Sequence, residues 1–75
     1  MAEVNFKGIG NLTVFADPEV VKNPYSGVAV ELEPEAVALY DFIKGCEMMR
    51  KYTEMEKALT IFRTRWPKEY MDLLD

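Results

Sequence analysis

The sequence predicts an α+β fold: a single domain over residues 1–75, in which a small antiparallel three-stranded sheet (residues 1–33) packs on two to three helices (residues 34–75). Three observations support this prediction. A chain of 75 residues has room for one hydrophobic core. Its composition, 49% hydrophobic and 29% charged, is typical of a globular domain. Apolar residues alternate in the first half and follow a helical period after Pro34.

Alternating apolar residues predict three short strands in the first half. The first two strands flank a Gly/Asn-rich turn at residues 8–11, which is the pattern of a β-hairpin. Asp17–Pro18 ends the second strand, because proline has no N–H to donate, and Val20–Val21 is expected to be a short extended piece. A turn at residues 23–27 leads to the third strand. The strand residues are Val4 and Phe6, then Leu12, Val14 and Ala16, then Val28, Val30 and Leu32.

The first helix is predicted over about residues 34–50. Pro34 is favoured at the first helical position, and Glu35 is favoured beside the N-terminal dipole. The apolar residues that follow fall within an arc of about 140°. Gly45 could end the helix early, but the apolar stripe stays in phase across it, so we expect the helix to continue. The stripe contains Ala38, Leu39, Phe42, Ile43, Cys46 and Met49, whereas Val37 and Met48 fall on the polar side.

A second and a third helix are predicted after residue 52. Thr53 and Glu56 have the spacing of a capping box at the start of the second helix. Pro67 ends that helix and can begin a short third one. Trp66 completes the stripe of the second helix and is expected to be a core residue. The second helix carries Met55, Ala58, Leu59, Phe62 and Trp66 on one stripe, and the third carries Tyr70, Leu73 and Leu74 on one face.

The residues of catalytic and metal sites are scarce in this chain. There is no histidine and one cysteine, which removes the most common general base, the usual triads and the common structural zinc sites. Cys46 lies within the apolar stripe, so we expect it to be a core residue; it cannot form an internal disulfide. We therefore expect no catalytic residue, no cofactor, no metal site, no small-molecule substrate and no enzyme activity.

Two short motifs have plain structural interpretations. Gly8–Gly10 lacks the third glycine and the lysine of phosphate loops, so a hairpin turn is expected. Glu31, Glu33 and Glu35 place three acids within five residues, but a hard cation needs more convergent oxygens. A solvated strand edge and helix N-terminus are expected there instead.

The charge and hydropathy of the chain exclude further classes. The net charge of −4 argues against nucleic-acid binding, although six bases gather within residues 50–68. An acidic DNA-mimic-type inhibitor is kept as a second alternative function, although its carboxylates are few and mixed with bases. The longest apolar run, Ala36–Tyr40, falls far short of the roughly 20 residues that span a bilayer. Glu3 and Lys7 interrupt any signal-peptide pattern, so a cytoplasmic location without membrane association is expected.

Association with another chain is the function that these features favour. Domains of this size bury about 60% of their unfolded surface, so they often depend on a staple or a partner. We expect a partner that is another protein or a second copy of this chain. The candidate interface residues are Tyr25, Met48, Tyr52 and Ile61, which remain after the core is filled, and an exposed sheet edge is the other candidate surface.

Part of the sequence resembles a group of small bacteriophage proteins. The resemblance covers roughly residues 22–75. It rests on Asn23-Pro24-Tyr25-Ser26-Gly27, on Val28, Val30, Leu32 and Pro34, on Leu39-Tyr40-Asp41, and on an ending with Phe62, Trp66-Pro67, Tyr70-Met71, Leu73-Leu74 and Asp75. It implies a phage accessory protein that binds a host or phage protein in the cytoplasm of an infected bacterium, or alternatively a minor structural component of the virion. The group has no defined activity, so the resemblance assigns no functional residues.

Overall fold

The computed structural model describes residues 2–14 and 17–74, which form four strands and three helices. The order is β1 (Ala2–Phe6), β2 (Gly10–Val14), β3 (Glu19–Lys22), β4 (Ala29–Leu32), α1 (Pro34–Met49), α2 (Tyr52–Arg65) and α3 (Pro67–Leu73). The broad α+β class is therefore confirmed. Ala16, which the alternation assigned to the second strand, and Asp75, which belongs to the phage-like ending, lie outside the described residues.

The predicted three-stranded sheet is wrong, because the strands form two separate antiparallel hairpins. β1 pairs with β2, and β3 pairs with β4, each in a two-stranded sheet. The segment interpreted as a short extended piece is β3, and it is the partner of β4 across the turn at residues 23–27. For β4, β3 is the nearest strand in the sequence, so this pairing costs little chain entropy, whereas β2 ends at Val14, much further from the start of β4 at Ala29.

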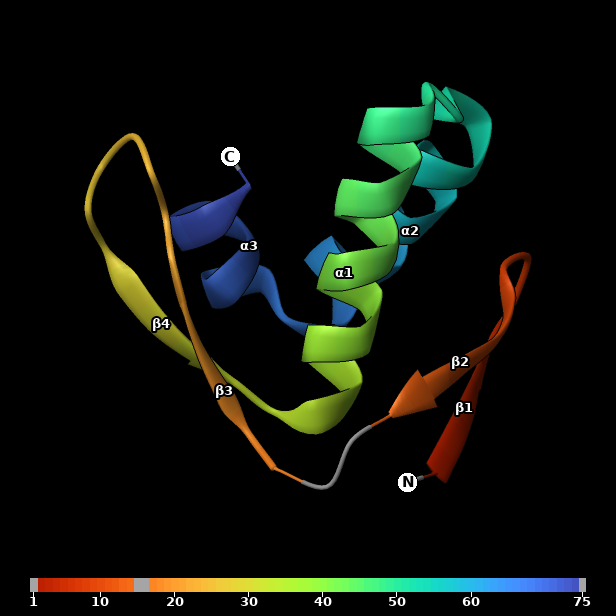
Figure 1. Ribbon diagram of the computed structural model, residues 1–75, viewed down its shortest axis with the longest axis horizontal. Helices are drawn as coiled ribbons and strands as arrows, with labels where there is room; N and C mark the ends of the chain where they lie inside the picture. Colours follow the sequence, from red (N-terminus) through yellow and green to blue (C-terminus); the bar gives the residue numbers. More distant parts are fainter. Residues whose placement is uncertain (1, 15–16, 75) are drawn as a thin grey trace.

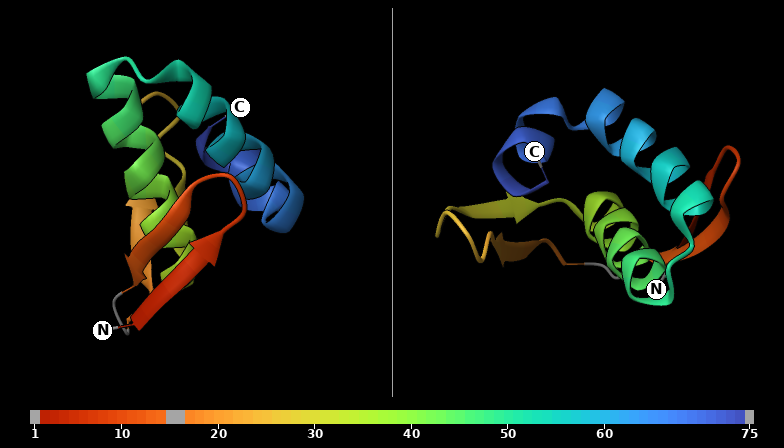
Figure 2. Two further views of the ribbon diagram at one scale, coloured as in Figure 1. Left: turned by 90° about the vertical axis from the view of Figure 1, so that its right-hand side faces the viewer. Right: turned by 90° about the horizontal axis from the view of Figure 1, so that it is seen from above.

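The two hairpins lie on different sides of the helices (Figure 1). β2 packs against α1, and β4 packs against both α1 and α3. α1 and α2 run side by side, and α3 turns back toward the second hairpin (Figure 2). A two-stranded ribbon has little stability alone, so each hairpin depends on its helical support.

α1 runs through Gly45 as expected, and it ends in a left-handed residue. Arg50 has φ +59°, and the following N–H of Lys51 donates to the carbonyl of Cys46 at 2.8 Å. This arrangement has the bonds of a Schellman motif, with arginine in the position that glycine usually occupies. The helix therefore ends through its backbone geometry, four residues after Gly45.

The predicted capping box of α2 is wrong. α2 begins at Tyr52 with Lys51 at the N-cap, and no side chain caps it. The Lys51 carbonyl accepts a hydrogen bond from Met55 N–H at 3.0 Å, so the first helical bond forms directly after the turn at Arg50. Thr53 is consequently already inside the first turn and not at its start.

The burial of two residues of α1 is the reverse of the sequence prediction. Val37, expected on the polar side, is 7% exposed, because α1 is covered by β2 and β4 as well as by α2. Met49, expected on the apolar stripe, is 66% exposed, because it is the last residue of the helix. In its first half, α1 is therefore buried over a wider arc than the predicted apolar stripe. Its last residues are exposed on all sides.

The core lies where α1, α2 and the hairpins meet. Its largest fully buried side chains are Leu32, Leu39, Ile43 and Phe62. Three aromatic rings continue through it: Tyr40 and Phe62 have centroids 6.5 Å apart, and Phe62 and Trp66 have centroids 5.5 Å apart. These are favourable tilted contacts. Trp66 is buried, which confirms its expected place in the core.

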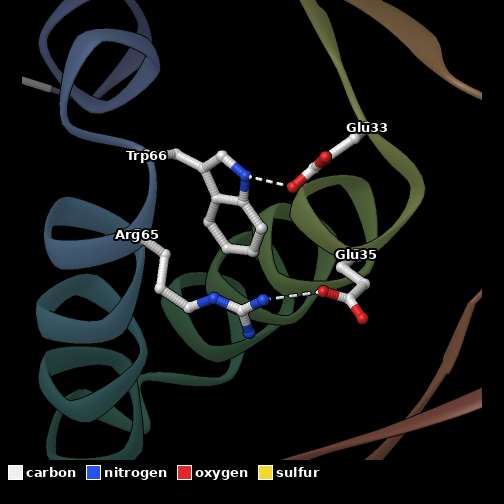
Figure 3. Close-up of polar contacts among 4 residues, drawn as sticks. All are labelled: Glu33, Glu35, Arg65 and Trp66. Atoms are coloured by element: carbon white, nitrogen blue, oxygen red, sulfur yellow. Dashed lines mark hydrogen bonds and ion pairs between the residues drawn. The ribbon is translucent and has the colours of Figure 1, made fainter.

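A pair of polar contacts fixes the junction of α2 and α3 to the start of α1 (Figure 3). Trp66 Nε1 donates to Glu33 Oε1 at 2.6 Å, and Arg65 donates to Glu35 Oε2 at 2.8 Å. The Arg65 guanidinium also lies over the rings of Phe6 and Trp66, 5.5 and 4.7 Å from their centroids. Two of the three acids expected to be merely solvated therefore hold the helices together.

Candidate functional site

An open cleft lies between the β3–β4 turn and all three helices, with a volume of about 590 Å³. Figure 1 shows the elements that contribute residues to it, namely the β3–β4 turn, α1, α2 and α3. It is lined by Asn23, Tyr25 and Ser26 of the turn, by Ile43, Lys44 and Glu47 of α1, by Met55 and Leu59 of α2, and by Leu73 and Leu74 at the end of α3. Its size lies within the range of sites that bind ligands or protruding side chains.

Asn23 builds the turn that forms one wall of the cleft. Its Oδ1 accepts hydrogen bonds from the N–H groups of Tyr25 and Ser26, at 2.8 and 3.3 Å. Its backbone N–H donates to Val28 at 2.8 Å, and Gly27 completes the turn at φ +79°. An asparagine side chain that replaces a backbone turn in this way is a common means of fixing a loop.

The same side chain also joins the turn to α3. Asn23 Nδ2 donates to the Asp72 carbonyl at 2.9 Å, and Asn23 is the buried polar residue of the described core, 8% exposed. Both the oxygen and the nitrogen of the Asn23 side-chain amide are therefore hydrogen-bonded. The turn and the end of α3 consequently keep a fixed separation, and this separation sets the width of the cleft.

The floor of the cleft is apolar. Ile43 and Leu73 are buried, while the other three floor residues, Met55, Leu59 and Leu74, are half-buried. These three pack against the core on one side and remain accessible on the other. An apolar group that entered the cleft would cover them further, which is favourable by about 25 cal/mol per Å² of apolar surface.

The rim of the cleft carries mixed charge. Lys44 Nζ lies 3.8 Å from Glu47 Oε2, and both side chains are about half exposed. Lys44 Nζ also lies 5.4 Å from the centroid of the Tyr40 ring. An exposed pair of this kind contributes little to stability. It leaves a donor and an acceptor available beside an apolar floor.

Three of the four candidate interface residues lie on or next to this cleft. Tyr25 lines it and is 98% exposed. Met48, 85% exposed, follows Lys44 by four residues and so continues the same row of α1 one turn further. Tyr52, 57% exposed, precedes Met55 by three residues on α2 and therefore shares its side of the helix.

Ile61 belongs to a different surface. It is half-buried against the core and lines a smaller cleft of about 320 Å³ with Phe6 and Arg65, between β1 and α2. Nine residues separate it from Tyr52, which places the two on opposite sides of α2, about 180° apart. The structure therefore does not gather all four residues into one patch.

The residues that sequence reasoning missed are Asn23 and the apolar floor. Met55, Leu59, Leu73 and Leu74 carry the expected core pattern, and periodicity does not distinguish a covered core residue from the floor of an open cleft. The role of Asn23 could have been predicted from the sequence, because an asparagine directly before Pro-x-Ser-Gly is typical of a turn supported by its side chain. Cys46 is buried, as predicted.

The described residues contain neither a cluster of metal ligands nor a membrane-spanning helix. Within residues 2–14 and 17–74, no three cysteine or acidic side chains come close enough together to hold a metal ion. No helix in these ranges has both the length and the apolar character needed to cross a membrane. No protein-family model matches the chain, and no match is found among curated proteins or solved structures.

Proposed function

We propose that this protein is a non-enzymatic interaction protein that binds a segment of another protein in the cleft between the β3–β4 turn and the three helices. The observation that carries the proposal is Tyr25, a 98% exposed aromatic residue on a turn whose backbone is fixed by a buried asparagine, next to an apolar floor. An exposed aromatic side chain on a rigid support loses little entropy on binding, and tyrosine is enriched among residues that dominate interfaces.

The occupant that suits the cleft is a segment with a protruding apolar side chain and polar groups around it. The apolar side chain would cover Met55, Leu59 and Leu74, and the polar groups would meet Lys44 and Glu47 at the rim. Methionine adapts its shape to the surface it meets, so Met48 and Met55 suit a contact with an irregular partner. An apolar centre with a polar rim is the usual anatomy of a protein interface.

The resemblance to small bacteriophage proteins supports an accessory role in infection. Under this proposal the protein acts in the cytoplasm of an infected bacterium and binds a host or phage protein. A minor structural role in the virion is the other form of the same proposal. Mass spectrometry of purified particles separates the two, since an accessory protein is absent from particles and a structural component is retained in them.

Matched substitutions test the cleft. The tagged protein is used to capture partners from infected cells, alongside Tyr25→Ser, Met48→Ser and Met49→Ser. Tyr25 and Met48 belong to the cleft and its margin, whereas Met49 is the neighbouring exposed methionine and lines a different cleft with Ile9 and Phe42. A partner that is lost with the first two variants and kept with Met49→Ser supports the proposal.

Two outcomes would contradict it. One is a partner that all three variants retain equally, because the cleft would then play no part in binding. The other is the absence of any specific partner when the captured material is compared with an untagged control. All three positions are exposed, so the variants are expected to fold as the unaltered protein does, and circular dichroism checks this.

A further inference from the structure

The β1–β2 hairpin has an open strand edge on the side of β1. β2 packs against α1, and within residues 2–14 and 17–74 β1 has β2 as its only strand neighbour. The left-hand view of Figure 2 shows β1 along the outer side of the hairpin. An open strand edge presents N–H and C=O groups that can pair with another strand.

The hydrogen bonds of the hairpin identify which backbone groups of β1 point outward. The Phe6 carbonyl accepts a hydrogen bond from Ile9 N–H at 3.0 Å, so the backbone groups of Phe6 face the turn and β2. Successive residues of a strand face opposite ways, so the backbone N–H groups of Glu3, Asn5 and Lys7 point outward, as do the first two carbonyls. The side chain of Asn5 supports this, because it donates to the residue opposite on β2 at 2.8 Å, as expected in the closer, non-bonded type of pair.

A cleft of about 320 Å³ lies beside this edge, between β1 and α2. Its lining includes Phe6, which is buried, and Ile61, which is half-buried against the core. Residues two apart in a strand share a face, so Val4 lies with Phe6 on the helix side of the hairpin. A strand added to β1 would therefore place alternate side chains over this cleft and cover Ile61.

The sequence of β1 and the residue after it is complementary to itself in the antiparallel direction. When Asn5 of two antiparallel copies are placed opposite each other, Glu3 of each copy lies directly opposite Lys7 of the other. Val4 of each copy then lies directly opposite Phe6 of the other. Directly opposed residues share a face of the sheet, so the opposite charges meet on the solvent face and the apolar pairs lie on the helix face beside the cleft.

The charged residues of this edge are available for such a contact. Glu3 and Lys7 are both exposed, and neither forms an ion pair within residues 2–14 and 17–74. Opposite charges directly across two strands are favourable, whereas like charges there are unfavourable. Because the pairing is symmetric, an opposite-charge pair forms at each of its two ends.

We infer that a second copy of this chain pairs with the edge of β1, so that two antiparallel β1 strands join the hairpins into one four-stranded sheet in the order β2–β1–β1–β2. The surface is separate from the cleft beside Tyr25, and the inference does not depend on the function proposed there.

Other two-fold registers are less favourable. The axis must pass through a residue position, because directly opposed side chains lie on the same face. Centring on Glu3 opposes two acids, and centring on Val4 leaves neither charge opposite its complement. Centring on Phe6 brings the two turns into the pairing. The register about Asn5 forms about four backbone hydrogen bonds, so the expected dimer is weak and reversible.

Exchanging the two charges tests the inference in the full chain. Sedimentation equilibrium over a concentration series should show a reversible monomer–dimer equilibrium for the unaltered protein. Lys7→Glu places two acids opposite each other at both ends of the pairing, and Glu3→Lys places two lysines there, so each should weaken dimerisation about tenfold. Combining the two substitutions places opposite charges there again and should restore the dimer.

Net charge is controlled in two ways. The two single substitutions change the net charge of the chain in opposite directions, so net charge does not account for a loss in both. Lys22→Glu alters an exposed lysine of β3 and changes the net charge by the same amount as Lys7→Glu, and it should leave the dimer unchanged. All three positions are exposed, so the variants are expected to fold, and circular dichroism checks this.

Cross-linking tests the register independently of charge. Asn5→Cys places two thiols opposite each other across the two-fold axis, so a short bifunctional thiol reagent should link the two copies. Asn11→Cys is the matched control, because it lies opposite Asn5 on β2 and loses the same side-chain hydrogen bond. Its two copies lie three strand spacings apart, about 14 Å, so the reagent should not link them. The native Cys46 is buried and serves as an internal control in the unaltered protein.

The inference is overturned if the protein stays monomeric at every concentration, if neither single substitution weakens the dimer, or if the combined variant does not recover it. It is also overturned if the reagent links Asn11→Cys as readily as Asn5→Cys. A monomer whose captured partner is lost in Lys7→Glu would assign this edge to a strand of another protein in place of a second copy. In contrast, Tyr25→Ser should leave the dimer intact, so failure of one proposal is distinguishable from failure of the other.

Discussion

Gly45→Ala should stabilise the protein. Gly45 lies inside α1, four residues before the helix ends, and its φ is not in the left-handed region. A methyl group built at this position has no neighbouring atom within 4 Å, so it meets no obstacle and covers no apolar surface. The effect therefore comes from the backbone, because glycine loses more conformational freedom than alanine when a helix forms. The expected gain is about 1 kcal/mol in the free energy of unfolding.

Gly27→Ala is the matched control for this prediction. Gly27 also has open space around a methyl group, but its φ is +79°, where alanine is strained. The same substitution should therefore destabilise the protein by about 1–2 kcal/mol. The two variants should change the free energy of unfolding in opposite directions. Packing does not account for this difference, because the added methyl group meets open space at both positions.

Thermal unfolding followed by circular dichroism measures both variants. A change of 1 kcal/mol shifts the Tm of a domain of this size by about 4–8 °C, which is readily resolved. Gly45→Ala should raise Tm and Gly27→Ala should lower it. A decrease in Tm for Gly45→Ala would refute the reasoning, because it would mean that α1 does not run through this position as a regular helix. An increase for Gly27→Ala would refute the left-handed turn.

Four further substitutions test the contacts that hold the elements together and the C-cap of α1. Asn23→Asp keeps the acceptor for the Tyr25 N–H but faces the Asp72 carbonyl with an acceptor, so urea unfolding should show a loss of about 1–3 kcal/mol; an unchanged midpoint would contradict the link between turn and α3. Trp66→Phe removes the donor to Glu33, which is worth about 1 kcal/mol, and should cost more than this in total because the smaller ring also leaves a cavity in the core. Glu33→Ala removes the same hydrogen bond without the cavity, so a double-mutant cycle with additive costs would argue against the hydrogen bond. Arg50→Gly relieves the left-handed residue after α1 and should add about 1 kcal/mol; a lower Tm would show that this C-cap is not strained.

The order of strands and helices was largely predictable because local rules set it. Proline at the start of a helix, alternation in the strands and the apolar stripes identified α1, α2 and α3 within a few residues. The predicted capping box was wrong because the chain leaves α1 in a tight turn that begins α2 two residues earlier, with Lys51 and not Thr53 at the N-cap. A local capping motif does not form when the end of the preceding helix already sets the backbone conformation at that position.

The pairing of the strands and most of the candidate site were not predictable in the same way. Val20–Val21 gave a strand signal too short to separate from an extended loop, so its pairing with β4 was missed. The cleft collects residues from four elements, and each floor residue has the pattern of an ordinary core position. Tyr25, Met48 and Tyr52 were identified in advance as exposed apolar residues, because each could be recognised within its own short segment.

The sequence by itself determined that extended segments precede helices and that the 75 residues contain no histidine. These properties depend on composition and on periodicity within short windows. Only the tertiary structure decided that the strands form two hairpins, that Glu33 and Glu35 hold α2 against α1, and that a cleft stays open beside Tyr25. The physical reason is that these features arise between segments far apart in the chain, where the result depends on which surfaces are covered first and no local pattern records it.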